Sequence, residues 1–127
     1  MRVIIAGSRD FNDYAVLKHN VLKILIELSP TKQPEAEIIS GTARGADQLG
    51  ERFAKEYNYP IKQMPANWDK YGKSAGYRRN EDMALYAKED NGVLIAFWDG
   101  ISKGTKHMID LANKHGLKVF VVKYADL

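Results

Sequence analysis

The stretch RVIIAGSRD (Arg2–Asp10) decides the expected fold. Its segment Val3–Ala6 is continuously apolar with no polar alternation, which is typical of a strand covered on both faces. The apolar run stops at a glycine, and small polar and charged residues follow it, as in a tight turn after a strand. The stretch therefore predicts a buried parallel strand whose carboxyl end carries a glycine loop.

Similar apolar runs recur along the chain, with helical patterns between them. Further strands are predicted at Ala36–Ser40, Gly92–Ala96 and Lys118–Lys123, with a weaker one at Ile61–Met64. Apolar residues at three- and four-residue spacing predict helices over Tyr14–Leu28, Ala46–Tyr57, Arg78–Ala87 and Thr105–Ala112. This alternation indicates right-handed βαβ crossovers. We therefore expect an α/β fold: a three-layer, Rossmann-like, single domain over residues 1–127, whose mostly parallel five-stranded sheet has helices on both faces.

The composition excludes several classes of protein. The chain has no cysteine, which rules out a disulfide scaffold, a thiolate nucleophile and the usual structural zinc sites. His19, His107 and His115 lack metal-site spacing, so we expect neither a metal nor a cofactor. The net charge of +3 comes from scattered cations, which makes polymeric nucleic acid a less favoured partner. Apolar runs are far shorter than the roughly 18 residues of a membrane span, so the sequence predicts a cytoplasmic protein without membrane contact.

Three of the predicted strands end in loops rich in glycine and small polar residues. These loops are Gly7–Asp10, Ser40–Asp47 and Phe97–Thr105. Glycine and serine are what tight turns require, so one such loop alone indicates little. Three loops at the same edge of a parallel sheet, two of them with arginine, favour a ligand site, because ligands of such folds bind outside the carboxyl ends of the strands.

The chemistry of these loops suits an anion. Glycine lets a ligand approach the backbone N–H groups, and the helix that follows offers unpaired N–H donors and a partial positive charge. Arginine adds bidentate contacts to phosphate or carboxylate. The sequence has neither GxGxxG after the first strand nor GxxxxGK[ST], so conventional dinucleotide and P-loop chemistry are not expected. The candidate ligand-binding residues from these loops are Gly7, Ser8, Arg9, Gly41, Ala43, Arg44, Gly45, Ser102, Gly104 and Thr105.

The segment Pro65–Arg79 is longer than an ordinary strand-to-helix connection. Two interpretations of its Trp68 stay open: the ring stacks on a base, as Trp98 in the later loop also could, or it folds back over the sheet edge. Arg78, Arg79 and Asn80 are expected to open the next helix. Cations at a helix N-terminus oppose the macrodipole, so this cluster favours an anion site over a stabilising role.

Acidic residues in the glycine loops are the candidates for chemistry. Asp99 could accept a hydrogen bond from a ribose hydroxyl or a base edge. Asp47 has a similar place, although it could equally be a helix-start residue favoured by the dipole. With Arg79, these two are the candidate catalytic residues.

Four motifs resemble the SLOG superfamily, and most closely its YspA/YpsA-related branch (DUF2493). They are GSRDF (Gly7–Phe11), SGTARGAD (Ser40–Asp47), PANWDKYGKSAGYRRNEDM (Pro65–Met83) and AFWDGISKGTKHMI (Ala96–Ile109). The resemblance implies a Rossmann-like sheet that binds nucleotides or their derivatives. It extends more distantly to the lonely-guy phosphoribohydrolases and to the DNA-processing protein DprA.

The lonely-guy enzymes carry two motifs that this chain keeps only in part. Their RKxxM motif resembles Arg79–Met83, with Asn80 in the place of lysine, and their PGGxGTxxE motif keeps its Gly-Thr at Gly104 and Thr105. Met108 stands where those enzymes have the catalytic glutamate, and a methionine neither activates water nor stabilises an oxocarbenium-like centre.

Three functions follow from these features. The first is binding of a small nucleotide-like ligand by a sensor or sequestering domain, in bacteria or in the host cytoplasm if the chain is phage-encoded. The second is cleavage of the N-glycosidic bond of a nucleoside monophosphate, with Asp47 or Asp99 replacing the missing glutamate. The third is DprA-like binding of single-stranded DNA. The resemblance also predicts a homodimer.

Overall fold

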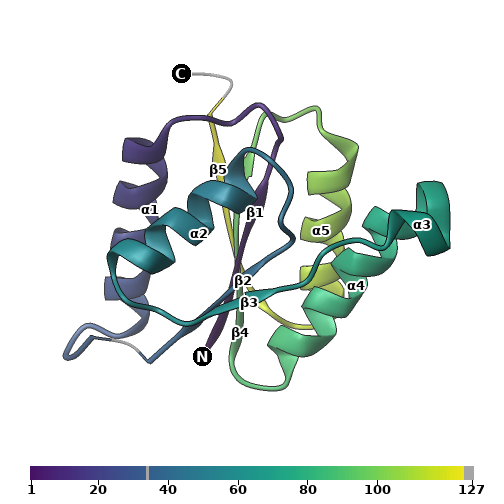
Figure 1. Cartoon of the computed structure of the whole chain (residues 1–127). Coiled ribbons are helices and arrows are strands. Elements are labelled where there is room, and N and C mark those ends of the chain that lie inside the picture. Colours follow the sequence, from purple (N-terminus) through teal and green to yellow (C-terminus); the bar gives the residue numbers. More distant parts are fainter. Residues whose placement is uncertain (34, 125–127) are drawn as a thin grey trace.

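The fold is built on one sheet of five parallel strands. The computed structural model, which describes residues 1–33 and 35–124, orders the strands β3-β2-β1-β4-β5 (Figure 1). The strands are β1 (Arg2–Gly7), β2 (Glu37–Ser40), β3 (Ile61–Gln63), β4 (Gly92–Trp98) and β5 (Lys118–Lys123). Each of the four pairings is parallel, which confirms the predicted α/β, Rossmann-like architecture.

Helices cover both faces of the sheet. They are α1 (Tyr14–Leu28), α2 (Ala46–Glu56), α3 (Trp68–Tyr71), α4 (Ala75–Lys88) and α5 (Lys103–Lys114), with a 3₁₀ turn η1 (Gly72–Ser74) between α3 and α4. In Figure 1, α1 and α2 lie on one face, α4 and α5 on the other, and α3 projects past the end of α4. Among the described residues, no helix is long and apolar enough to cross a membrane.

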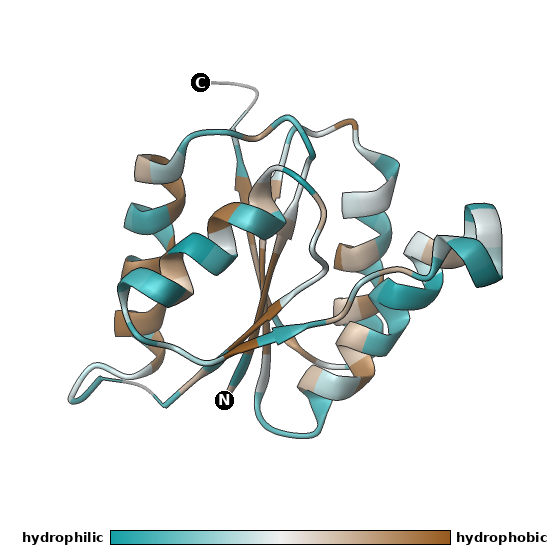
Figure 2. Ribbon diagram, in the orientation of Figure 1, coloured by the Kyte–Doolittle hydropathy of each residue, from teal (hydrophilic) through white to brown (hydrophobic). Residues whose placement is uncertain are grey.

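Strand β1 supplies both cores. Val3 and Ile5 pack in the cluster formed with α1 and α2, whereas Ile4 and Ala6 pack in the cluster formed with α4 and α5. Figure 2 shows hydrophobic residues along the central strands. Burial of successive residues on opposite faces explains why the strand reads as a continuous apolar run.

Most predicted boundaries are shifted by one or two residues, and two larger differences bear on the site. Strand β4 continues to Trp98 instead of ending at Ala96, so Trp98 belongs to the sheet. Helix α4 begins at Ala75, three residues before Arg78, because α3 and η1 fold the preceding segment into a compact turn. Arg78, Arg79 and Asn80 are the fourth to sixth residues of α4, so the prediction that they open this helix is wrong.

The strand order creates a switch point. From β1 the chain adds β2 and then β3 on one side of the sheet. It then returns to the other side of β1, where it adds β4 and then β5. The carboxyl ends of β1 and β4 lie side by side, with Gly7 opposite Phe97. The loops that follow these two strands diverge to opposite faces and leave a crevice between them.

Gly7 makes this close pairing possible. A Cβ at this position would lie 2.2 Å from the Phe97 carbonyl oxygen and 2.9 Å from the Cβ of Ala46. No side chain fits between the end of β1, the backbone of β4 and the start of α2, so Gly7 is required for packing as well as for the turn.

We expect Gly7→Ala to lower the free energy of unfolding by more than about 3 kcal/mol, because backbone on both sides would have to move. Urea unfolding followed by circular dichroism measures the effect. The control is Gly104→Ala, where an added Cβ meets nothing within 4 Å; it should change the stability by less than about 1 kcal/mol. Equal unfolding midpoints for the two variants would contradict the packing argument.

Candidate functional site

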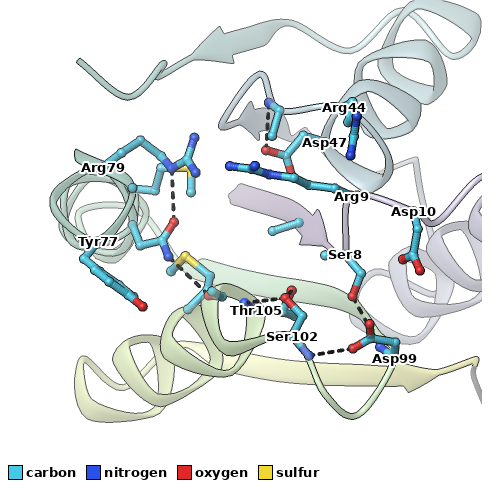
Figure 3. Close-up of a pocket in the computed structure, with 18 of the residues that line it drawn as sticks. Ser8, Arg9, Asp10, Arg44, Asp47, Tyr77, Arg79, Asp99, Ser102 and Thr105 are labelled. Atoms are coloured by element: carbon cyan, nitrogen blue, oxygen red, sulfur yellow. Dashed lines mark hydrogen bonds between the residues drawn. The ribbon is translucent and has the colours of Figure 1, made fainter. Parts of the chain in front are cut away.

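A pocket of about 470 Å³ opens at the switch point between β1 and β4. This volume lies in the range of small-ligand sites. Figure 3 shows polar and charged side chains converging on it from the loops after β1, β2 and β4 and from α4. Its lining is formed by Ala6, Gly7, Ser8, Arg9, Asp10, Ala43, Arg44, Asp47, Trp68, Lys73, Gly76, Tyr77, Arg79, Asn80, Met83, Asp99, Ser102, Gly104, Thr105 and Met108.

The loops after β1 and β2 are packed directly on each other. The backbone N–H of Ala46 donates to the carbonyl of Ser8. Gly45 has a φ of 84°, and a Cβ there would lie 2.5 Å from the Ser8 carbonyl oxygen. Gly45 therefore supports the wall of the pocket from behind and does not line it, whereas Arg9 and Arg44 do.

Asp47 is a buried carboxylate in this wall. It lies in the first turn of α2, and its Oδ2 accepts a hydrogen bond from the Ala43 N–H at 3.2 Å. Burial raises the pKa of Asp47 to about 6, against the opposing attraction of Arg79. A carboxyl group that titrates near neutrality in a pocket can exchange protons with a ligand.

Arg79 faces Asp47 across Gly41. Its guanidinium donates to the Gly41 carbonyl at 2.5 Å through Nη1 and to the Asn80 side chain at 3.0 Å through Nε. Burial lowers the pKa of Arg79, and the positive charge of Arg9 acts in the same direction. Figure 3 shows Arg9 extending beside Asp47 toward Arg79. Two guanidinium groups thus share the neighbourhood of one buried carboxylate, and an added anion would relieve their repulsion.

The opposite wall is the start of α5. Ser102 caps this helix, because its Oγ accepts from the Thr105 N–H at 3.4 Å. Gly104 lines the pocket without a side chain, so a ligand can approach the first turn of the helix closely. Buried Thr105 donates its hydroxyl to Ser102 Oγ at 3.2 Å.

Asp99 organises the loop before α5. Its Oδ1 accepts from the N–H groups of Ile101 at 2.8 Å and Ser102 at 2.7 Å, and its own N–H donates to Ser8 Oγ. The two backbone N–H groups lower the pKa of Asp99. An ionised carboxylate occupied in this way is suited to shaping the loop and poorly suited to donating a proton.

Trp68 stands at the mouth of the pocket and remains 50% exposed. A Cβ on Gly76 would lie 3.4 Å from its ring, so Trp68 leans on the start of α4. The structure brings Trp68 to the pocket, where the base-stacking interpretation requires it, and the stacking itself stays a prediction. Trp98 does not line the pocket, and its Nε1 donates to the Ser102 carbonyl at 3.1 Å.

Arg78 and Gly41 also lie outside the lining. The Arg78 guanidinium packs 4.5 Å from the centre of the Tyr71 ring, and its Nε donates to Ser74 Oγ. Gly41 lies behind the pocket, where a Cβ would collide with both Arg79 and Asp47. Asn80 does line the pocket, but its amide is occupied by protein partners.

Sequence reasoning missed Lys73 and Tyr77. Both line the pocket, and the Tyr77 ring packs edge-on against His107 of α5 at 4.5 Å. Burial lowers the pKa of His107. Tyr77 and Asn80 lie three residues apart and would have been placed on one helix face if the start of α4 had been set earlier. Lys73 lies in η1, before this helix, where no helical periodicity marks it. Met108 lies on the pocket floor and is 1% exposed.

The pocket lining contains no group of three or more side chains suited to hold a metal ion, and the same holds across residues 1–33 and 35–124 as a whole.

Comparison with known proteins agrees with this geometry. Residues 1–71 match the family model described as "YspA, cpYpsA-related SLOG family". The matched part includes β1, β2 and both glycine loops that carry Arg9 and Arg44. The chain belongs to this family.

One similar protein is the "Gene 61 protein" of Mycobacterium phage D29. It is 32% identical over 123 residues, and the alignment covers 93% of each chain. The similarity to a phage protein fits an origin in bacteria or phages. Membership of the SLOG family indicates nucleotide-related ligand binding in general and names no particular ligand.

The two pocket carboxylates should affect stability with opposite signs. Because the pKa of folded Asp47 is raised to about 6 from 3.8, its contribution to stability is complete below about pH 4 and is lost as the pH rises through 6. Asp47→Asn keeps an oxygen acceptor for Ala43 and should stabilise the ligand-free protein at pH 7.5 by about 2 kcal/mol. Thermal unfolding from pH 4 to pH 8 measures the effect.

Asp99→Asn is the matched variant. The pKa of Asp99 is lowered, so its contribution is present above the unfolded-state pKa and is lost as the pH falls. This variant should lower the melting temperature at pH 7.5 and change it less at pH 3. If both variants shift stability in the same direction at pH 7.5, the assignment of opposite environments is wrong.

Proposed function

We propose that this protein binds a nucleotide or nucleotide-derived ligand in the switch-point pocket, as a sensor or sequestering domain. The observation that carries the proposal is the convergence of the Arg9, Arg44 and Arg79 side chains and the open first turn of α5 on one pocket. Guanidinium groups and a helix N-terminus are both established binders of phosphate.

The charge balance of the pocket supports an anionic ligand. Arg9, Arg44, Lys73 and Arg79 are its cationic residues, and Asp10, Asp47 and Asp99 are its carboxylates. Asp10 accepts a hydrogen bond from the Tyr124 hydroxyl at 2.8 Å, and Asp99 is held by its own loop. Asp47 is mostly ionised at pH 7.5, so four cationic side chains face three carboxylates in the pocket. A phosphate supplies the missing negative charge.

The remaining pocket features suit the rest of a nucleotide. Trp68 and Tyr77 offer ring faces and edges at the mouth, where a base would stack. Ala6, Met83 and Met108 provide an apolar floor. In this arrangement the phosphate lies against Gly104 and the arginines, and the base lies toward α3.

Cleavage of an N-glycosidic bond is the second candidate function. Buried Asp47 favours it, because a carboxyl group with a pKa of about 6 can act as a general acid or base. Against it stands Met108 on the pocket floor, which offers no acid-base group. Binding without turnover is therefore the first choice.

The proposed biological role is to sense or to sequester the nucleotide that the pocket binds. A domain that binds a signalling nucleotide tightly can report its concentration or remove it from solution, and the phage relative fits action inside a bacterial host cell. A homodimer with one pocket in each copy is part of the same proposal, and its mass is measurable by light scattering.

A thermal-shift panel tests the proposal. It contains nucleoside mono-, di- and triphosphates, cyclic dinucleotides, ADP-ribose derivatives and a single-stranded oligonucleotide. At least one small ligand should raise the melting temperature in a saturable manner and be recovered intact by chromatography. Release of free base that Asp47→Asn abolishes would establish the hydrolase instead. No shift with any nucleotide, together with salt-sensitive retention of the oligonucleotide, would favour DNA binding.

Two neighbouring arginines provide a matched pair for this panel. Arg79→Gln removes a guanidinium that lines the pocket, whereas Arg78→Gln removes one held on Tyr71 outside it. We expect Arg79→Gln to weaken binding of the identified ligand by about 10- to 100-fold, the cost of a charge-assisted hydrogen bond, and Arg78→Gln to leave it unchanged. Gly104→Ala should also weaken binding, because its methyl group occupies the approach to α5.

A further inference from the structure

The amide of Asn80 joins two walls of the pocket. Asn80 lies on α4 and is 7% exposed. Its Oδ1 accepts from Arg79 Nε at 3.0 Å, and its Nδ2 donates to the Gly104 carbonyl at 3.3 Å. The same Nδ2 lies 3.3 Å from His107 Nδ1. One side chain therefore contacts the pocket arginine, the first turn of α5 and a histidine one turn further along that helix.

The partners fix the orientation of this amide. Arg79 Nε–H can only donate, so the atom facing it must be the oxygen. The Gly104 carbonyl can only accept, so the atom facing it must be the NH₂ group. His107 Nδ1 is then the acceptor of the second amide hydrogen, and the ring proton lies on Nε2.

We propose that Asn80 is a positioning residue that sets the Arg79 guanidinium relative to the first turn of α5. This inference rests on the proposed function, because it concerns the same anion. Arg79 carries several rotatable bonds, and its Nη1 contact with Gly41 alone leaves the plane of the guanidinium free to turn. The second hydrogen bond at Nε fixes that plane and directs the remaining N–H groups.

Asn80 also contacts the opposite wall of the pocket, through its hydrogen bond to the Gly104 carbonyl. The Gly104 carbonyl belongs to the first turn of α5, and Gly104 itself lines the pocket, so the contact with Asn80 helps to fix the position of this turn. Through Asn80, a shift of α5 relative to α4 would also move Arg79. The Arg79 guanidinium and the first turn of α5 can contact one phosphate together only at the spacing that Asn80 maintains. Holding the two groups at this spacing before the ligand arrives lowers the cost of binding.

The first experiment needs no ligand. In ¹⁵N-resolved NMR spectra, Arg79 Nε–H should give a signal protected from solvent exchange in the wild-type protein. Asn80→Ala should remove the protection, because the acceptor is lost. Asn80→Asp should retain it, because a carboxylate oxygen accepts the same bond. Asn113→Ala, which changes an exposed asparagine of α5, is the control and should leave the signal unchanged.

The second experiment measures affinity with AMP and inorganic phosphate as probes, by calorimetric titration. We expect Asn80→Ala to weaken binding of both probes at least about tenfold, with Asn113→Ala unchanged. Asn80→Asp should also weaken binding, because it restores the contact with Arg79 but repels the Gly104 carbonyl and adds negative charge beside the phosphate. Melting temperatures identify any variant that has lost its fold. If Asn80→Ala unfolds, the nearly isosteric Asn80→Asp replaces it in the affinity measurement.

The outcomes separate the two proposals. If the wild-type protein binds neither probe nor any nucleotide, the proposed function fails, and the NMR result still decides whether Asn80 positions Arg79. If Asn80→Ala keeps the protected Arg79 signal, the positioning role is refuted whatever the affinity. If the signal is lost while the affinities equal those of the wild type, Asn80 holds Arg79 without consequence for the anion, and the inference is overturned.

Discussion

The pocket depends on the direct contact between the ends of β1 and β4. Gly7 and Phe97 are paired there without space for a side chain, while the chain leaves the two strands toward opposite faces of the sheet. Parallel strands bring their carboxyl ends to one edge, and the change of direction opens a crevice at this place alone in the sheet order. The loops with Arg9 and Ser102 follow these two strand ends, and the start of α2 with Asp47 is held on the first of them by the Ala46 N–H.

Asp47 and Asp99 have different roles in the pocket because their environments shift their pKa in opposite directions. Asp99 lies among backbone N–H groups that favour its charge, and it holds the loop that leads into α5. Asp47 is buried beside arginines that only partly compensate the loss of water around it. Asp99 thus anchors a loop, whereas Asp47 is a carboxylate whose negative charge is only partly compensated by its neighbours. Carboxyl groups with a pKa perturbed in this way are concentrated at functional sites.

Much of the fold and part of the site could be predicted from the sequence. The strands were predictable because each is buried on both faces, and the loop residues from Gly7 to Arg9 and from Ser102 to Thr105 because parallel sheets place them together. The course of Pro65–Arg79 was not predictable, since α3 and η1 contain no buried residue and leave no apolar periodicity. For this reason the start of α4 was placed too late and Tyr77 was missed. The prediction ended β4 at Ala96, although its apolar run continues through Phe97 and Trp98 to Asp99 and Gly100, so Trp98 was wrongly placed in the loop.

The positions of the two tryptophans give the protein an optical property. They are the two tryptophans of the chain; Trp68 is half exposed at the pocket mouth, and Trp98 is tied to the Ser102 carbonyl just behind the first turn of α5. Indole emission responds to the polarity and stacking around the ring. Occupation of the pocket would change the surroundings of Trp68 directly and those of Trp98 through its loop. The molecule therefore contains its own fluorescent reporter, and ligands can be screened without attaching a dye.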